Sequence, residues 1–345
     1  MRNSNSYCIF CCTGESEYGG MIPSTATPFA MTRWTPYTNE NYISTCPYVY
    51  GNSTFHGFLG THQPAVWMGE SGQVAISAGS GPVKTDFLER GLQFSHGQEI
   101  SMPHYYKVVV NGSADSSIVA ELTATSRASY IQFTFDSIAA SSFVAVEVTR
   151  AYFVGNVFID TKKREISGWN PERQDSKLGP FTASGFKGYF VARFDEDFDS
   201  WGTVSDSAIL PDSLHRTGPS LSAYVTFPSN IKRVHVRVGV SYISIDQARQ
   251  NIDNEIPDGA TLEDTAKAVE KLWADKLDLV EITNATEDEK TIFYTAMYHA
   301  LQVELSYAPQ MQFTDPHYEL MKCPSCTVPT TSLFVVVSGC SIRMK

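Results

Sequence analysis

The chain has 345 residues, of which 42% are hydrophobic, and this is enough to bury the core of a large domain. The formal net charge is -11 at pH 7, and lysine and arginine are scattered, so no basic patch points to a nucleic-acid backbone. The longest apolar run near the carboxyl end, Leu333–Val337, is too short to cross a membrane. We therefore expect neither nucleic acid nor a membrane as a partner.

The cysteines are concentrated at the two ends of the chain. Of the seven cysteines only Cys46 lies in the body, so the body does not depend on disulfides. Two Cys-x-x-Cys pairs, one near each end, could together bind zinc. Atypical terminal sequence is the preferred interpretation, because no turn glycine or histidine accompanies either pair. The pairs are Cys8/Cys11 and Cys323/Cys326.

Signals for export point in two directions. Residues 1–12 lack the apolar run of a secretory signal peptide. Three sequons for N-linked glycosylation nevertheless favour a secreted or extracellular parent protein. The candidate acceptors are Asn52, Asn111 and Asn284.

The first two thirds of the chain have the pattern of a β protein. Residues 13–60 are rich in Gly, Pro and Thr without a helical period, and they are predicted to form loops and short strands. From about 72 to 245, apolar runs rich in β-branched and aromatic residues alternate with turn residues such as Asn111-Gly112. This pattern predicts a mainly β fold with a large antiparallel β-sandwich. The predicted strands are 73–77, 105–110, 117–122, 130–135, 143–148, 153–159, 187–193, 222–227 and 233–240.

Helical periodicity begins near residue 244. Ser244 and Gln247 form a capping-box pattern, in which the hydroxyl accepts from the Gln247 amide and the glutamine side chain reaches back. A second helix is predicted after Thr261, with an apolar stripe through 268–277, and a third after Thr286, with acidic residues at its positive end. Neither helix can bury its apolar face alone, so each needs the sandwich or another part of the protein.

Four motifs occur in order along the chain. They are GGMIPSTATPFAMTRWT at 19–35, GFLGTHQPAVWMGESG at 57–72, VGVSYIS at 238–244 followed by Gln247, Arg249 and Asn251, and FYTAMYHAL at 293–301. Over roughly 13–302 the chain thereby resembles the amino-terminal half of glycoside hydrolase family 92, which comprises calcium-dependent, inverting, exo-acting α-mannosidases, commonly α-1,2. The resemblance implies a galactose-mutarotase-like supersandwich, linking helices and a carboxy-terminal (α/α)6 barrel.

The resemblance also implies a division of the chain. The expected segments are an atypical amino-terminal segment at 1–12, a β-sandwich domain at 13–255, a linker helix and first barrel helix at 256–302, and an atypical tail at 303–345, predicted to be disordered. Both ends depart from the family pattern, since the family's opening strand and the continuation into the barrel have no counterpart. We therefore expect a chain without its catalytic barrel, either from a gene-model artefact or as a truncated isoform.

The expected mechanism depends on the barrel. An inverting glycosidase needs a protonated carboxyl beside the leaving oxygen and a carboxylate that activates water on the opposite face. In the family these groups and most of the calcium shell belong to the barrel, so we expect neither catalytic residues nor tightly bound calcium in this chain. Acidic residues such as Glu15, Glu17, Glu70 or the run Asp195–Asp199 are an alternative catalytic set, although charge runs are usually solvated loops. The run Asp195–Asp199 has oxygen donors for calcium, but not the EF-hand spacing.

Sandwich loops in the family help to line the subsite of the terminal mannose. The matching positions are Gly19, Gly20, Arg33, Trp34, His62, Gln63, Trp67 and Glu70. Each has an alternative interpretation: the tryptophans as core residues, His62 as a hydrogen-bonded structural histidine, and Arg33 with Glu70 as an ion pair or as solvated charges. On the last helix, Tyr298 and His299 are expected to serve helix packing, with a pocket role as the alternative.

Three classes of function remain open from the sequence. The preferred one is the sandwich of an α-mannosidase that contacts mannose-containing glycans and is inactive alone. The second is a stand-alone carbohydrate-binding module, and the third is an enzyme that uses its own residues or an adhesion-type sandwich. Exposed apolar stripes on helices 261–280 and 287–301 are expected to promote self-association.

Overall fold

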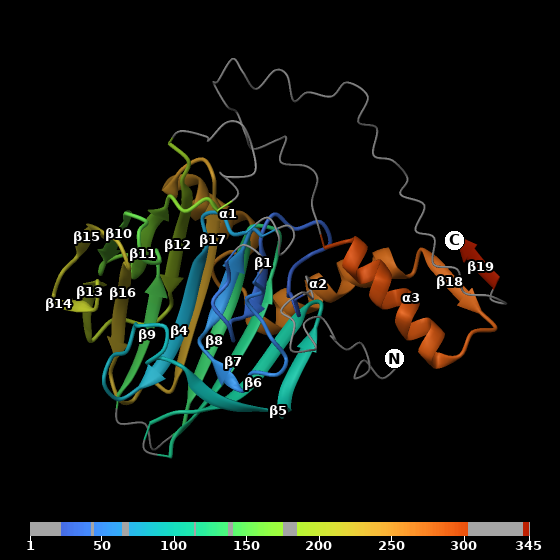
Figure 1. The fold of residues 1–345 in the computed structure, drawn as a ribbon, viewed down its shortest axis with the longest axis horizontal. Coiled ribbons are helices and arrows are strands. Elements are labelled where there is room, and N and C mark those ends of the chain that lie inside the picture. Colours follow the sequence, from blue (N-terminus) through green and yellow to red (C-terminus); the bar gives the residue numbers. More distant parts are fainter. Residues whose placement is uncertain are drawn as a thin grey trace.

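The computed structural model describes residues 22–42, 45–63, 69–113, 115–136, 141–174, 185–302 and 341–344, and its framework is a sandwich of two antiparallel sheets (Figure 1). The first sheet has seven strands in the order β1-β3-β4-β9-β16-β13-β14, and the second has ten in the order β15-β10-β11-β12-β17-β8-β7-β6-β5-β2. The predicted mainly β sandwich is therefore confirmed.

The strands of the first sheet are β1 (Arg33–Pro36), β3 (Phe58–Thr61), β4 (Val74–Ser80), β9 (Ser142–Glu147), β13 (Ser200–Ser205), β14 (Ala208–Pro211) and β16 (Ser222–Phe227). Those of the second sheet are β2 (Thr54–Phe55), β5 (Leu92–Met102), β6 (Tyr105–Asn111), β7 (Ser117–Ala124), β8 (Ala128–Phe135), β10 (Gly155–Asp160), β11 (Glu165–Asn170), β12 (Gly188–Phe194), β15 (His215–Gly218) and β17 (Arg233–Ser241).

The core lies between the two sheets because alternate residues of each strand point inward. In β7 the inward set is Ile118, Ala120 and Leu122, each at most 1% exposed. Across the gap, Phe58 of the first sheet meets Tyr106 of the second in an edge-to-face contact at 5.8 Å. All nine predicted strands are present, with bounds that shift by a few residues.

Three helices follow the sandwich, as predicted. They are α1 (Ile245–Glu255), α2 (Leu262–Leu277) and α3 (Glu287–Ala300). None of these helices in the described part of the chain has the length and hydropathy of a membrane-spanning segment. The α1 capping box is only half formed: the Ser244 side chain accepts from the Gln247 amide, but the Gln247 side chain donates to Asn251 at 3.0 Å. The complete capping box is at α3, between Thr286 and Glu289.

The helices are docked on the sandwich through the segment that leads into β1. The buried Trp273 of α2 donates its indole N–H to the Ala26 carbonyl at 2.7 Å, and the Tyr298 hydroxyl of α3 donates to the Ser24 carbonyl at 2.6 Å. Tyr298 therefore serves helix packing. By contrast α3 has one buried side chain, Phe293, and Ile292 is 62% exposed.

A short third sheet pairs β18 (Val280–Thr283) with β19 (Ser341–Met344), antiparallel. Residues 341–344 belong to the segment that the sequence predicts to be disordered, and here their backbone pairs with a strand. The remainder of that segment, 303–340 and 345, lies outside the described residues, as does the atypical segment 1–12.

Candidate functional site

The predicted site residues meet at one end of the seven-stranded sheet. Strand β1 pairs with β3 in a register that places Arg33 opposite Thr61, the last residue of β3. The chain then leaves β3 and returns as β4 at Val74, which pairs with β3. Residues 62–73 therefore form a connection at this end of the sheet, and its described part begins with His62 and Gln63 and resumes at Gly69.

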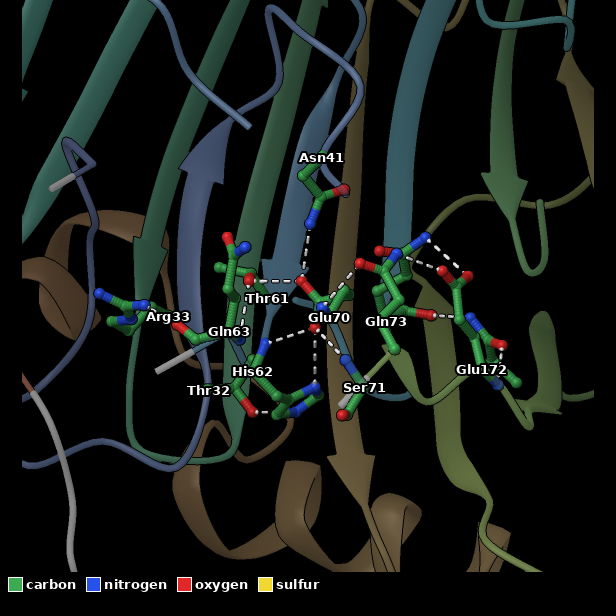
Figure 2. A network of polar contacts seen from close by, with 12 residues as sticks. Thr32, Arg33, Asn41, Thr61, His62, Gln63, Glu70, Ser71, Gln73 and Glu172 are labelled. Atoms are coloured by element: carbon green, nitrogen blue, oxygen red, sulfur yellow. Dashed lines mark hydrogen bonds and ion pairs between the residues drawn. The ribbon is translucent and has the colours of Figure 1, made fainter. Parts of the chain in front are cut away.

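The buried side chain of Glu70 holds the two described ends of this connection together. Its fully buried carboxylate accepts hydrogen bonds from the backbone N–H groups of His62 at 2.8 Å and Ser71 at 2.9 Å (Figure 2). The side chains of Thr61 and Asn41 donate to its other oxygen at 2.5 and 2.9 Å. Because one carboxylate joins both ends of the connection, it fixes the path of the loop between them.

His62 is a buried neutral imidazole. It is 7% exposed, its Nε2 lies 2.8 Å from the Thr32 hydroxyl, and its ring is tilted against Tyr242 at 5.0 Å between centroids. Burial lowers the pKa of His62 to about 4, so the ring carries no charge at neutral pH. The Nδ1 atom lies 3.9 Å from a Glu70 oxygen.

A second buried carboxylate, Glu172, forms the other half of the network with Arg150. The Arg150 guanidinium pairs with Glu172, donates to the Gln73 side chain at 3.0 Å, and donates to both the backbone and side-chain oxygens of Asn41. Asn41 in turn donates to Glu70, so the row from Arg33 to Glu172 in Figure 2 is one connected set of polar contacts.

The sequence reasoning missed Asn41, Arg150 and Glu172. Asn170, the last residue of β11, and Glu172 are fully buried and two positions apart, but Arg173 between Glu172 and Gln174 is charged, so no alternation of polar and apolar residues marks them in the sequence. Asn41 carries no local pattern either.

The individual site predictions have different outcomes. Arg33 is 8% exposed and donates to the Gln63 carbonyl, so it joins β1 to the start of the connection. Trp34 is fully buried in the sandwich core, against Gly60 of β3. This burial agrees with the alternative interpretation of Trp34 as a core residue, and its sugar contact stays a prediction. Gly19, Gly20 and Trp67 lie outside the described residues.

The three glycosylation candidates differ in their surroundings. Asn52 donates its side-chain amide to the Thr38 carbonyl at 3.0 Å. Asn111 is the exposed last residue of β6, and Asn284 is exposed before α3 with a positive φ of 58°. Asn111 and Asn284 therefore have room for a glycan.

Of the alternative catalytic and calcium residues, Glu15 and Glu17 lie outside the described residues, and the acidic run that begins at Asp195 is engaged in other contacts. Asp195 pairs with Arg237 at 2.9 Å, Glu196 with His235 at 2.7 Å, and Asp197 with Arg164 at 3.2 Å. In the part of the chain that the structure describes, no group of three or more His, Cys, Asp or Glu residues is arranged to hold a metal ion.

The site also differs from a hydrolytic centre. The carboxylates of Glu70 and Glu172 are fully buried and bonded to protein donors, so neither can reach a water molecule beside a bound sugar. A cavity of about 620 Å³ lies between α2, residues 27–28 and the β7–β8 turn, and no predicted site residue lines it. The contacts of Glu70 hold the loop between β3 and β4 in place.

Comparison with protein families identifies the chain. The model of the glycosyl hydrolase family 92 N-terminal domain matches residues 9–241, and that of the family 92 catalytic domain matches residues 247–322. The chain therefore belongs to glycosyl hydrolase family 92. The first match ends at the last residue of β17, and the second begins within α1. Comparison with curated protein sequences gives no significant match.

Solved structures of the same family share the fold. The family GH92 inverting mannosidase BT2199 from Bacteroides thetaiotaomicron matches with a TM-score of 0.74 and 26% identity, over 84% of this chain and 38% of that chain. The family GH92 α-mannosidase BT3965 from the same organism matches with a TM-score of 0.70 and 23% identity, over 86% of this chain and 41% of that chain. The chain thus spans about two fifths of the length of these enzymes.

Proposed function

We propose that this chain supplies the amino-terminal sandwich of an inverting α-mannosidase that removes α-1,2-linked mannose from mannose-rich glycans or glycoproteins. Membership of family 92 supports the proposal, as does the similarity to an inverting mannosidase at 26% identity. The three sequons favour a secreted or extracellular parent enzyme.

Within this function, the sandwich lines part of the subsite for the terminal mannose. The observation that carries this role is the double attachment of Glu70 to the backbone of His62 and Ser71, which presents Arg33, His62 and Gln63 at one end of the sheet. The segment that enters β1 from this side also holds α2 and α3, which lie in the match to the catalytic domain. Glu70 is a positioning residue in this proposal, since its carboxylate is internal.

The chain alone is proposed to be inactive. Hydrolysis with inversion needs an acid and a base on opposite faces of the sugar, and the buried carboxylates around Glu70 are occupied by protein donors. Calcium is the expected cofactor of the complete family enzyme, where most of its ligands are expected in the barrel. No step of the proposed role of this chain depends on the metal.

The test is a titration of the full chain with methyl α-mannoside, followed by amide NMR, together with an assay for mannose release from α-1,2-mannobiose. We expect shifts at Arg33 and Gln63, loss of binding in Arg33→Ala, and no release of mannose. Arg233→Ala, an exposed arginine at the start of β17, is the matched control and should bind normally.

Three results would contradict this proposal. Release of mannose by the unchanged chain would show an active site within it. Binding of α-mannan tighter than about 1 mM, without involvement of Arg33, would favour a stand-alone carbohydrate-binding module. Unchanged amide signals at saturating mannoside would exclude the mannose subsite.

A further inference from the structure

The partly exposed side chain of Tyr42 packs against a buried cation, the guanidinium of Arg150. The ring is 44% exposed, and the Arg150 guanidinium carbon lies 4.6 Å from its centroid. A guanidinium at this distance holds an aromatic face by a cation–π attraction. One face of the ring is therefore occupied by Arg150, while much of the remaining surface is in contact with solvent.

Arg150 itself has little freedom to move. It is 6% exposed, and its nitrogens are bonded to Glu172, Gln73 and Asn41. Because the guanidinium is planar and its donors are fixed in a fork, these partners set its orientation as well as its position. The guanidinium against which the Tyr42 ring packs is therefore held in one orientation.

Tyr42 is also tied to the candidate mannose site through its neighbour in the chain. Asn41 donates to the Glu70 carboxylate, as Figure 2 shows, and the Tyr42 carbonyl accepts from the Thr45 amide at 2.9 Å. Consecutive Cα atoms are about 3.8 Å apart, so Tyr42 lies within the span of a short oligosaccharide from the Glu70 connection.

A carboxylate completes the surface beside the ring. Glu40 is two positions before Tyr42 and is partly exposed, and burial together with the Glu40 carboxylate raises the pKa of the Tyr42 hydroxyl. Burial raises the pKa of the Glu40 carboxyl above its usual value. An aromatic face with an adjacent oxygen acceptor suits a pyranose, whose C–H face is apolar while its hydroxyl groups donate hydrogen bonds.

We propose that Tyr42, with Glu40 beside it, is a second carbohydrate-binding position, which takes the sugar unit next to the terminal mannose. This inference rests on the proposed function, because it assigns the terminal mannose to the neighbouring site around Arg33 and Gln63. It makes Tyr42 a determinant of chain length: a disaccharide should gain affinity over a monosaccharide through stacking on this ring.

The test uses the full chain with labelled aromatic carbons and three probes: methyl α-mannoside, α-1,2-mannobiose and maltose. We expect α-1,2-mannobiose to shift the Tyr42 ring signals, and the other two probes to leave them in place. In Tyr42→Ala, the affinity for mannobiose should fall by a factor of roughly 3 to 10, the size of one aromatic contact, while the affinity for the monosaccharide stays the same.

Two variants separate stacking from general effects. Tyr42→Phe keeps the ring and should retain most of the mannobiose affinity. Phe158→Ala removes a ring of comparable exposure, 43%, from β10 and should bind both sugars as the unchanged chain does.

The outcomes distinguish this inference from the proposed function. Tyr42 ring signals that no oligosaccharide shifts, or an unaltered affinity ratio in Tyr42→Ala, would overturn the second position even if Arg33 and Gln63 respond to mannoside. Arg33 and Gln63 signals that stay unchanged would overturn the mannose subsite, whatever Tyr42 does. Since the ring signals are read on the unchanged protein, the test does not depend on how well a variant folds.

Discussion

The Glu70 carboxylate accepts the backbone N–H of His62, eight residues earlier in the chain, at 2.8 Å. The same oxygen accepts the N–H of Ser71 at 2.9 Å, so a single buried atom joins the two ends of a loop. A charged acceptor in the interior is stable only when donors surround it. Four donors surround the Glu70 carboxylate. Because the backbone N–H groups of His62 and Ser71 are two of them, both ends of the loop are held in position.

Replacing this carboxylate tests its structural role. Glu70→Gln turns one acceptor oxygen into a donor that faces other donors, so we expect the free energy of unfolding to fall by roughly 2–4 kcal/mol. Urea denaturation followed by circular dichroism measures the change. Glu270→Gln on the exposed face of α2 makes the same chemical change without buried partners and should have little effect. Equal stability of the two variants would contradict the organising role of Glu70.

Stability should depend on pH through His62. Its pKa in the folded chain is about 4, below the value of 6.5 for an ordinary histidine, so the unfolded chain binds the proton first as the pH falls. The contribution is therefore fully present above pH 6.5 and is lost as the pH falls toward 4, with a size on the order of 3 kcal/mol.

The measurement for His62 is the urea midpoint of unfolding between pH 7 and pH 4.5. We expect His62→Gln to show a weaker dependence on pH than the unchanged chain, because the group that the folded state cannot protonate is gone. His215→Gln, an exposed histidine in β15, should keep the full dependence. Parallel pH curves for the unchanged chain and His62→Gln would exclude the histidine as the cause.

The framework could be predicted from the sequence, and the polar network only in part. Strands such as β6 and β7 alternate between buried and less buried residues, so their pattern is visible in the sequence. By contrast β14 has four apolar residues that are all exposed at a sheet edge, and β5 is mostly polar, so neither shows the alternation of a half-buried strand.

The same distinction holds within the site. His62, Gln63 and Glu70 are neighbours in one motif, and the sequence predicts them together. Asn41 follows β1 and Arg150 follows β9, 109 positions apart, and they meet because these two strands belong to one sheet, with β3 and β4 between them. No local periodicity encodes such a meeting, because it depends on the order of strands in the sheet.

Self-association through the helices remains a prediction. Leu279, at the end of α2, is 51% exposed and Ile292 of α3 is 62% exposed, which leaves apolar surface that a second copy could cover. Sedimentation velocity at increasing concentration should show oligomers of the full chain, and Leu279→Glu with Ile292→Glu should suppress them. Leu88→Glu, which changes an 82% exposed leucine of the sandwich, is the control and should still associate. A concentration-independent monomer would refute the prediction.

Close contact between α1 and the sheet depends on Gly239 in β17. A Cβ at this position would lie 2.1 Å from the Ala248 carbonyl oxygen of α1, and backbone cannot rotate away as a side chain can. We expect Gly239→Ala to lower the free energy of unfolding by roughly 1–3 kcal/mol, the usual cost of overpacking. In Gly51→Ala the new methyl group meets no atom within 4 Å, so stability should be almost unchanged. A stable Gly239→Ala chain would mean that α1 does not pack as described.

Trp273 should control the docking of α2 on the segment that enters β1. Its ring is 3% exposed and its indole N–H donates to the Ala26 carbonyl, so Trp273→Ala removes both packing and a hydrogen bond, at a cost of about 3–5 kcal/mol. Hydrogen exchange should become faster in residues 22–30 and in α2, while the sandwich strands keep their protection, because local opening requires only the helix contact to break. The neighbouring Leu272 is 47% exposed, and Leu272→Ala should leave exchange in both segments nearly unchanged. If Trp273→Ala instead accelerates exchange uniformly across the sandwich, then α2 and the sheets unfold as one cooperative unit, and the helix is part of the domain core.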